Sequence, residues 1–345
     1  MKVIIQIPCL NEREHLPATF ADLPRTIPGV DAIEVLIIDD GSTDGTSEVA
    51  RELGVHHIVR FPRNRGLAAA YSAGLEACLR LGADAIVNTD ADNQYRGDDI
   101  AQLVAPVVAG RADLIVGDRQ TDKIAHFSSL KKFLQRFGSR VVRRLSGTNV
   151  TDTTSGFRAL NKRAAARLFV HNRFTYTLET LIQAGQSGLL VDNVTVRTNP
   201  MTRKSRLFRS IPDYLRRNGL VILRSYAMYQ PLRSFGYLAA LLFTLGSGLG
   251  LRFLYYYLDN PQQSGHVQSL LVGVGAVVLS FLVALMALLG ELLAANRRLL
   301  EDTLARTRGL DAAACSQARA RGEAIPGVES TGAASWSANK EEAGA

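Results

Sequence analysis

Short apolar runs alternate with amphipathic stretches through the first part of the chain. The runs are rich in Val, Ile and Leu, which is typical of buried strands. We expect strands at residues 3–7, 34–38, 57–60, 85–88, 114–116 and 189–196. Helical stretches separate the first four, near residues 13–23, 47–53 and 67–81. This alternation predicts an α/β domain over residues 1–200, with a mostly parallel, Rossmann-like sheet and helices on both faces.

The pattern changes after residue 200. Residues 201–233 mix many Lys and Arg with apolar residues, and such basic amphipathic segments suit a membrane interface. Two strongly apolar runs follow, and we expect transmembrane helices at residues 234–258 and 269–293, each near the roughly 20 residues that cross a bilayer. Residues 311–345 are rich in Ala, Gly, Ser and Glu without periodicity, and we expect a disordered tail there.

Charge around the two apolar runs predicts their orientation. Basic residues flank both runs on the outside, whereas the connecting loop at residues 259–268 contains no Lys or Arg. Positively charged flanks stay on the cytosolic side of a membrane. We therefore expect an integral membrane protein, in a bacterial inner membrane, with the catalytic domain and both termini in the cytosol.

The net charge of +8 indicates an anionic partner, which can be nucleic acid, a phosphate-bearing substrate or a membrane surface. The basic residues gather beside the apolar runs without the aromatic interleaving of stacking surfaces, which argues against nucleic acid. The chain has 3 cysteines, and they show no metal-ligand spacing. A reduced, cytosol-facing protein fits this composition.

Polar motifs follow three of the predicted strands, at residues 8–12, 39–46 and 90–94. Ligands of open α/β sheets bind beyond the carboxyl ends of the strands, so we expect these motifs to line one cleft. In the third motif, Asp90, Asp92 and Gln94 offer oxygen ligands for a hard divalent cation such as Mg2+ or Mn2+. Such a cation would neutralise a diphosphate.

The second motif is an acidic turn that holds two glycines. Asp39 or Asp40 can accept hydrogen bonds from a base or a ribose. The turn lacks the lysine and the spacing of a P-loop, and it also lacks the glycine pattern of dinucleotide-binding turns.

The order of the motifs carries a resemblance to a known family. Residues 8–12, 39–44, 64–66 and 90–94 together resemble family 2 glycosyltransferases of the GT-A fold. Later segments are similar to the dolichyl-phosphate mannose synthase and polyprenyl-phosphate glucosyltransferase group: residues 117–119, 152–158, 179 and 203–205. The resemblance covers about residues 1–295 and includes a two-helix transmembrane hairpin.

The resemblance implies a role for each motif. The residues that would bind the nucleotide-sugar are Pro8, Asn11, Glu12, Asp39, Asp40, Asp90 and Arg203. Those that would bind the acceptor phosphate are Arg119, Ser155, Arg158 and Ser205. Those that would hold Mg2+ or Mn2+ are Asp90, Asp92 and Gln94. The catalytic residues would be Asp92, Arg119, Ser155 and Glu179.

The resemblance implies inverting transfer of one sugar, most simply a hexose, from UDP-glucose or GDP-mannose to a polyprenyl phosphate such as undecaprenyl or dolichyl phosphate. The reaction would take place at the cytosolic membrane face. Processive synthases of this fold carry a Gln-x-x-Arg-Trp motif, but the single tryptophan here is Trp336, in the tail. Two membrane helices are also too few to extrude a polymer, so we expect one transfer per acceptor.

Two other functions stay open at this point. Sugar transfer to a lipid hydroxyl, such as that of diacylglycerol, would need a catalytic base, and Asp152 or Glu179 can supply one. A non-catalytic membrane scaffold or nucleotide-sensing module would use the same sheet without turnover. The identity of the sugar and its base, the lipid length and any homo-oligomer also stay open.

Overall fold

The computed structural model describes residues 1–120, 129–170, 176–200, 219–220, 223–224, 226–259 and 267–336, with the side chains of residues 129–137 left out. The chain divides into two compact units. The first consists of Met1–Arg216 and Glu301–Ala345, and the second of Arg217–Leu300.

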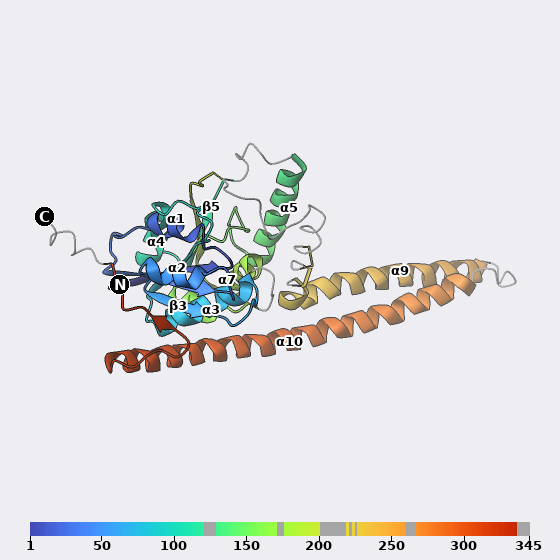
Figure 1. Cartoon of the computed structure of the whole chain (residues 1–345). Coiled ribbons are helices and arrows are strands. Elements are labelled where there is room, and N and C mark those ends of the chain that lie inside the picture. Colours follow the sequence, from blue (N-terminus) through green and yellow to red (C-terminus); the bar gives the residue numbers. More distant parts are fainter. Residues whose placement is uncertain are drawn as a thin grey trace. The chain divides into compact units, whose positions relative to one another are not determined.

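The first unit is built on one sheet (Figure 1). Its strands, within the described residues, are β1 (Lys2–Cys9), β2 (Ala32–Asp39), β3 (His57–Arg60), β4 (Ala85–Asn88), β5 (Leu114–Asp118), β6 (Arg158–Asn161), β7 (Val191–Thr195) and β8 (Glu329–Ser330). They lie in the order β7-β5-β6-β4-β1-β2-β3-β8. Strand β6 is antiparallel to β4 and β5, β8 is antiparallel to β3, and the other pairs are parallel.

All six expected strands are present, and β3 and β4 have the predicted bounds. Strands β6 and β8 were not predicted. Strand β6 is short and directly follows a polar loop, so it lacks the apolar run that marks the other strands. The expected α/β architecture with a mostly parallel sheet is confirmed.

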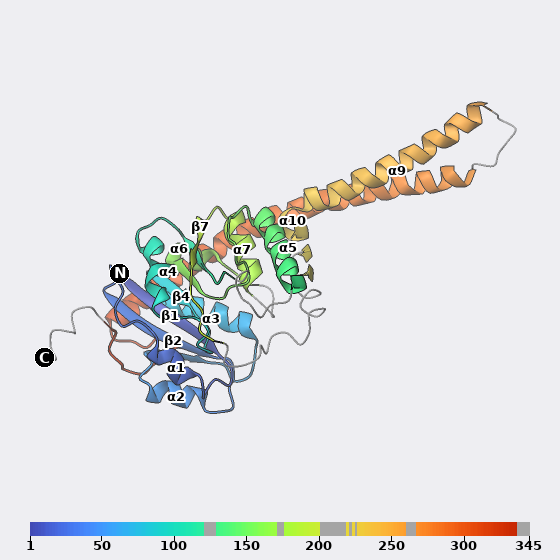
Figure 2. The same cartoon turned by 90° about the horizontal axis from the view of Figure 1, so that it is seen from above.

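The helices of this unit are α1 (Leu16–Ala21), α2 (Thr46–Glu52), α3 (Leu67–Arg80), α4 (Asp99–Val108), α5 (Ser129–Ser146), α6 (Lys162–Arg167) and α7 (Thr177–Gln186). Alternate residues of β1 serve opposite faces of the sheet. Val3 and Ile5 join a buried cluster with residues of α1, α2 and α4. Gln6 faces α3, where a Cβ built on Gly74 would lie 2.5 Å from its Oε1 atom. Helices therefore cover both faces (Figure 2).

The expectation of a disordered tail is wrong for residues 311–336. Helix α10 (Val267–Ala320) continues through the start of this range, and its last turns lie on the first unit. Arg308 is buried there; it donates hydrogen bonds to the Leu168 carbonyl (2.7 Å) and to Glu76 Oε1 (2.8 Å). Nearby, Arg80 Nε lies 2.6 Å from Asp311 Oδ2.

The residues after α10 close the edge of the sheet. Strand β8 pairs with β3, and Trp336 exchanges backbone hydrogen bonds with Ile33. The Trp336 ring lies 5.5 Å from the ring of Phe20, and the Arg25 guanidinium lies 3.6 Å above it. A few specific contacts order this segment, although its composition is poor in large apolar residues.

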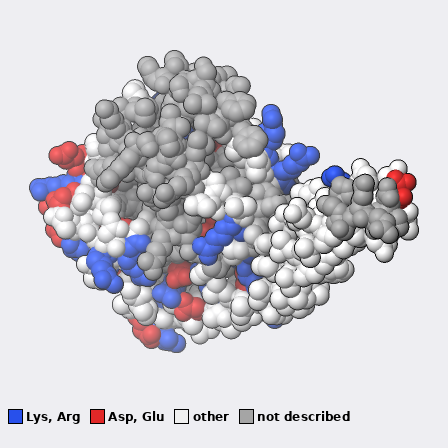
Figure 3. Space-filling view, turned by 90° about the vertical axis from the view of Figure 1, so that its right-hand side faces the viewer, with Lys and Arg blue, Asp and Glu red and all other residues white. Residues whose placement is uncertain are grey.

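The second unit contains α9 (Pro231–Asp259) and the first part of α10. Both helices are long and apolar enough to cross a membrane, and they contain the predicted segments 234–258 and 269–293. They pack antiparallel, since Gly246 meets Gly273 and Pro231 meets Gly290. A Cβ on Gly246 would lie 2.8 Å from the Gly273 carbonyl, so the small residues allow close approach of the two backbones. Most of the large side chains on the hairpin are apolar and exposed. Few charged residues are visible on it in Figure 3.

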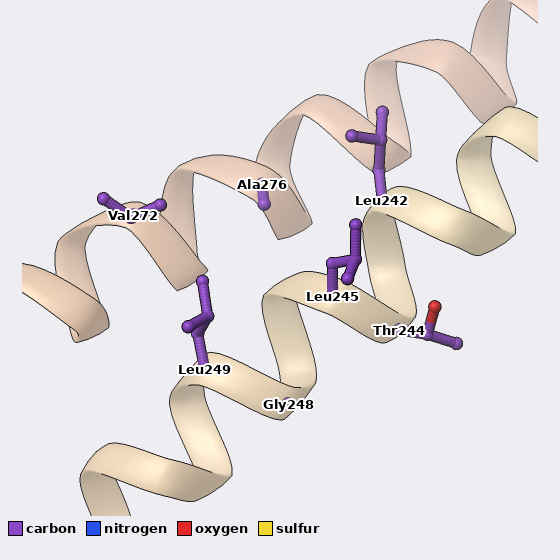
Figure 4. Close-up of a pocket in the computed structure, with 7 residues that line it drawn as sticks. All are labelled: Leu242, Thr244, Leu245, Gly248, Leu249, Val272 and Ala276. Atoms are coloured by element: carbon purple, nitrogen blue, oxygen red, sulfur yellow. The ribbon is translucent and has the colours of Figure 1, made fainter.

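A shallow apolar cavity of about 490 Å³ lies along this hairpin (Figure 4). Leu245 and Leu249 of α9 and Val272 and Ala276 of α10 border it. The remaining lining residues are Leu242, Thr244 and Gly248. Its lining offers a single hydroxyl group, so the cavity suits hydrocarbon rather than a polar ligand.

The contacts of His56 predict that acid weakens the docking of residues 331–336. Nδ1 of His56 accepts a hydrogen bond from the Val35 amide (3.0 Å), and Nε2 donates one to the Ala334 carbonyl (3.0 Å), so the ring is neutral. Burial lowers the pKa of His56 in the folded protein. As the pH falls below about 6.5, the unfolded chain therefore takes up the proton first. The stability that the neutral ring contributes is complete above that pH and is lost as the pH falls through the lowered folded pKa.

We expect the midpoint of thermal unfolding to fall more steeply in the wild type than in His56→Gln between about pH 7.5 and 5.5. Glutamine can make both hydrogen bonds without titrating. Circular-dichroism melts of the full chain in detergent measure the two slopes. Equal slopes in the two proteins would contradict the prediction.

Candidate active site

The candidate site lies where three parallel strands end side by side. Strand β1 pairs with β2 so that Cys9 is opposite Asp39, and with β4 so that Gln6 is opposite Asn88. The three polar motifs that follow these strands therefore leave the sheet at the same edge, as predicted. Hydrogen bonds between strand ends continue this pairing, since the Asp40 amide donates to the Cys9 carbonyl (2.9 Å).

The first two motifs hold each other in place. The Asn11 amide donates to Ser42 Oγ (2.9 Å), and Asn11 Oδ1 accepts from the Thr43 amide (2.9 Å). The Glu12 amide donates to Thr46 Oγ1 (3.0 Å). Asn11 has a φ of 53°, a left-handed conformation that asparagine tolerates better than most residues. Pro8, Asn11 and Glu12 thus lie at the predicted edge, and their contact with a nucleoside stays a prediction.

The first two carboxylates of the acidic turn, Asp39 and Asp40, are buried and bonded to the protein. Asp39 accepts hydrogen bonds from the Ser42 amide (2.7 Å) and the Ser47 hydroxyl. Asp40 accepts from the amides of Arg65 (2.7 Å) and Gly66 (2.9 Å), at the start of α3. Burial raises the pKa of Asp40, and these two amides oppose the shift. Asp39 has no exposed surface and Asp40 has 3%, so direct contact of these carboxylates with a nucleoside stays a prediction.

The acidic motif after β4 is the part of the site that stays open to solvent. Asp90, Asp92 and Gln94 are all partly exposed. Asp92 Oδ1 accepts a hydrogen bond from the Gln94 amide (3.3 Å), which fixes a turn in the second half of the motif. Asn199 fixes the loop from the other side, because its amide donates to the Gln94 carbonyl (2.9 Å) and its Nδ2 to the Asn93 carbonyl (3.0 Å).

The donor chemistry of this motif fits a hard cation that also binds a ligand. No group of three or more His, Cys, Asp or Glu side chains converges for a metal in the part of the chain that the structure describes. Two carboxylates and one amide are therefore the local donor set. Mg2+ is usually held by one or two carboxylates together with substrate phosphates, so this set suits a cation shared with a diphosphate.

Arg119 and Asp152 form a bidentate ion pair beside the motif. Nε of Arg119 lies 2.7 Å from Asp152 Oδ2 and Nη2 lies 3.0 Å from Oδ1, while Nη2 also donates to Thr154 Oγ1 (2.9 Å). Burial alone would raise the pKa of Asp152, but the charge and hydrogen bonds of Arg119 outweigh it and hold that pKa below its ordinary value. Arg119 is thereby oriented by its partner.

Two of the expected acceptor-binding residues are placed differently from the prediction. Arg158 is fully buried, and its guanidinium donates to the carbonyls of Ser155 (2.9 Å) and Thr177 (2.8 Å) and to Thr180 Oγ1 (2.8 Å). It braces the loop and α7 instead of reaching a phosphate. Ser155 is also fully buried, with Oγ accepting from the Phe157 amide (3.3 Å). Neither side chain is open to an acceptor in this structure.

Glu179 lies in the first turn of α7 and is mostly buried. Arg203 and Ser205 lie outside the described residues. The structure thus brings the three strand-end motifs and the Arg119–Asp152 pair into one region, and it places Glu179 on the helix that Arg158 fastens to the loop at residues 152–157.

The sequence pattern of Glycosyl transferase family 2 matches residues 4–169, which contain all three motifs. An uncharacterized protein of Methanocaldococcus jannaschii is 30% identical over 203 residues, which is 57% of this chain and 81% of that protein. The chain belongs to glycosyl transferase family 2. The expected family is confirmed, and the protein is a glycosyltransferase.

Two further likenesses concern a relative of known activity and a solved structure. The undecaprenyl-phosphate mannosyltransferase of Micrococcus luteus is 35% identical over 166 residues, or 46% of this chain and 66% of that protein. Glucosyl-3-phosphoglycerate synthase from Mycobacterium tuberculosis, crystallised with Mn2+, UDP-glucose and phosphoglyceric acid, gives a TM-score of 0.51 at 18% identity. The superposition covers 66% of this chain and 78% of that one, and it supports the fold.

The same region also contains polar side chains that the motifs did not reveal. Asn88, Tyr95 and Tyr176 are buried polar side chains that bond to the loop at residues 152–157. The sequence could have indicated Asn88, because an amide side chain at the end of an apolar strand must find hydrogen-bond partners when it is buried. Tyr95 and Tyr176 gave none, since buried aromatic residues are common in cores.

The placement of Arg158 predicts a stability defect when it is replaced. Arg158→Lys keeps the charge but cannot satisfy the same carbonyls, so we expect the thermal midpoint to fall by about 5–10 °C. Arg163→Lys, at an exposed site on α6, is the matched control and should melt like the wild type. Wild-type melting of Arg158→Lys, together with weaker binding of the lipid acceptor, would instead support a phosphate-binding role.

Proposed function

We propose that the protein transfers one hexose from a nucleotide-sugar to a polyprenyl phosphate at the cytosolic membrane surface. One observation carries the proposal: a family 2 domain shares its chain with two helices long and apolar enough to span a bilayer. A long isoprenoid stays within the bilayer, so an enzyme that uses it must work at the surface. The similarity to an undecaprenyl-phosphate mannosyltransferase supports the same acceptor class.

In this proposal the nucleotide-sugar lies along the strand ends. Asn11, Glu12, Asp39 and Asp40 border the nucleoside, and Asp90 lies near the ribose and diphosphate. Asp92 and Gln94, with Asp90, hold Mg2+ or Mn2+. When bound, the cation supplies Lewis-acid stabilisation of the leaving nucleoside diphosphate. The solved structure of the same fold that contains Mn2+ and UDP-glucose supports a divalent cation beside a nucleotide-sugar.

The acceptor phosphate is oriented by Arg119. Arg119 uses Nε and Nη2 on Asp152 and Thr154, which leaves the hydrogens of Nη1 available among the described residues. A phosphate monoester is largely ionised at neutral pH, so it can attack the anomeric carbon without a strong base. A single displacement inverts the anomeric configuration. Glu179 borders the donor sugar, and Arg203 and Ser205 close over the diphosphate or the acceptor.

Transfer to a lipid hydroxyl is the second candidate, and the pKa of Asp152 weighs against it. A hydroxyl acceptor needs a general base whose pKa lies near the working pH. The ion pair with Arg119 lowers the pKa of Asp152, which makes that carboxylate a weak base. Glu179 is the remaining candidate base for that reaction.

A donor panel tests the proposal. The purified full chain in detergent is incubated with undecaprenyl phosphate and, in parallel, with diacylglycerol. Each incubation contains Mg2+ or Mn2+ and one of UDP-glucose, GDP-mannose, UDP-galactose and UDP-N-acetylglucosamine, and the lipid is followed by mass. We expect undecaprenyl phosphate to gain the mass of one sugar, and we expect EDTA to prevent this. Adducts on diacylglycerol alone would move the assignment to the hydroxyl acceptor, and no adduct on either lipid would favour a scaffold or sensing role.

Replacing the proposed metal ligand should remove activity without unfolding the protein. We expect Asp92→Asn to lower transfer by about 100-fold or more, because the leaving diphosphate loses its electrostatic stabilisation. Asp98→Asn is the matched control, since Asp98 is exposed in the same segment and pairs only with Arg96 among the described residues. Transfer by Asp92→Asn at the control rate would remove Asp92 from the metal site.

A further inference from the structure

The loop at residues 152–157 lies directly against the acidic motif at Gly156. A Cβ atom built on Gly156 would lie 3.3 Å from both carboxylate oxygens of Asp90 and 2.9 Å from the Tyr176 hydroxyl. Its φ is not in the left-handed region. Glycine is therefore needed here for close approach to the Tyr176 hydroxyl and to Asp90, and not for its backbone conformation.

Three side chains fix the peptide groups of Gly156. Its amide donates to the Tyr95 hydroxyl (3.3 Å), and its carbonyl accepts from Asn88 Nδ2 (2.9 Å) and from the Tyr176 hydroxyl (3.3 Å). Asn88 Nδ2 also donates to the Tyr176 hydroxyl (2.9 Å), while Gln6 Nε2 donates to Asn88 Oδ1 (2.9 Å). Gln6 and Asn88 are fully buried, so this network has no competition from water.

The ring of Tyr176 is held in place by a ring of α3. It stacks on Tyr71 of α3 with 3.8 Å between ring centroids and 6° between ring planes, and both rings are buried. The two hydroxyl groups differ. That of Tyr176 is part of the Gly156 network, whereas that of Tyr71 has no hydrogen-bond partner within the described residues.

We propose that Tyr176 and Asn88 are positioning residues for the donor site, which act by holding Gly156 against Asp90. They keep the Asp90 carboxylate in one place, ready for the nucleoside diphosphate. The inference rests on the proposed function, because it takes Asp90 as part of the donor site. Both side chains are buried and act through Gly156.

The stacked tyrosines supply a matched pair of variants. Tyr176→Phe removes the bonded hydroxyl and Tyr71→Phe the other one, and both keep the ring stack. Calorimetric titration of the full chain in detergent with UDP and with GDP, in the presence of Mn2+, gives the dissociation constants. Tyr176→Phe removes both hydrogen bonds of the hydroxyl, so Gly156 is held less firmly against Asp90, and we expect binding to weaken about five- to tenfold. Tyr71→Phe should bind like the wild type.

A merely structural role gives a different result. It would reduce the fraction of Tyr176→Phe molecules that bind, with an unchanged dissociation constant for the rest. Gly156→Ala tests the same contact from the loop, because its methyl group would press on the Tyr176 hydroxyl and on the Asp90 carboxylate. It should weaken binding at least as much as Tyr176→Phe, and the double variant should bind no more weakly than Gly156→Ala alone, since both act through one contact.

The outcomes separate the two proposals. If Tyr176→Phe binds UDP and GDP like the wild type, the positioning role is overturned and the proposed function stays intact. The same holds if the double variant binds more weakly than Gly156→Ala alone. Absence of UDP and GDP binding by the wild type overturns the proposed function and the positioning role with it.

Discussion

The parallel pairing of β1 with both β2 and β4 is the constraint on which the rest of the site depends. Because the three strands are parallel, the polar motifs that follow them lie at the same edge of the sheet. The alternating faces of β1 then place Val3 and Ile5 against α1 and α4, and Gln6 against α3. Gln6 continues through Asn88 to Gly156, so the same strand that builds the core also begins the polar network behind Asp90.

Five of the carboxylates near this edge fall into two groups with different roles. Asp39, Asp40 and Asp152 are buried and hold amides, hydroxyls or a guanidinium of the protein. Asp90 and Asp92 are partly exposed and lie on a loop that Asn199 fastens from outside. Buried charges need partners, whereas partly exposed ones can exchange water for a ligand. The division explains how so acidic a region can be both rigid and open.

Local pattern predicted part of this arrangement and could not predict the rest. Strand β4 has the predicted bounds because its apolar residues, Ala-Ile-Val, lie between Asp84 and a polar motif. Strand β3 also has the predicted bounds, with Ile58 and Val59 between a histidine and an arginine. A sequence motif cannot tell whether an arginine is buried, so the bracing role of Arg158 needed the folded contacts. The tail looked disordered because its order comes from distant partners, such as Ile33 for Trp336. Contact of the strand-end residues with a nucleotide-sugar stays a prediction.

The pairing of β8 with β3 has a consequence for how the protein is made. An unpaired strand edge offers its backbone groups to any other chain, and such edges promote aggregation. Strand β3 is synthesised early, but the residues that cover it, such as Ser330 beside His57, emerge from the ribosome only after both apolar helices. Domains fold during synthesis, N-terminal parts first. The nascent sheet therefore has an interval in which its edge is open, and membrane insertion of the intervening helices would set the length of that interval.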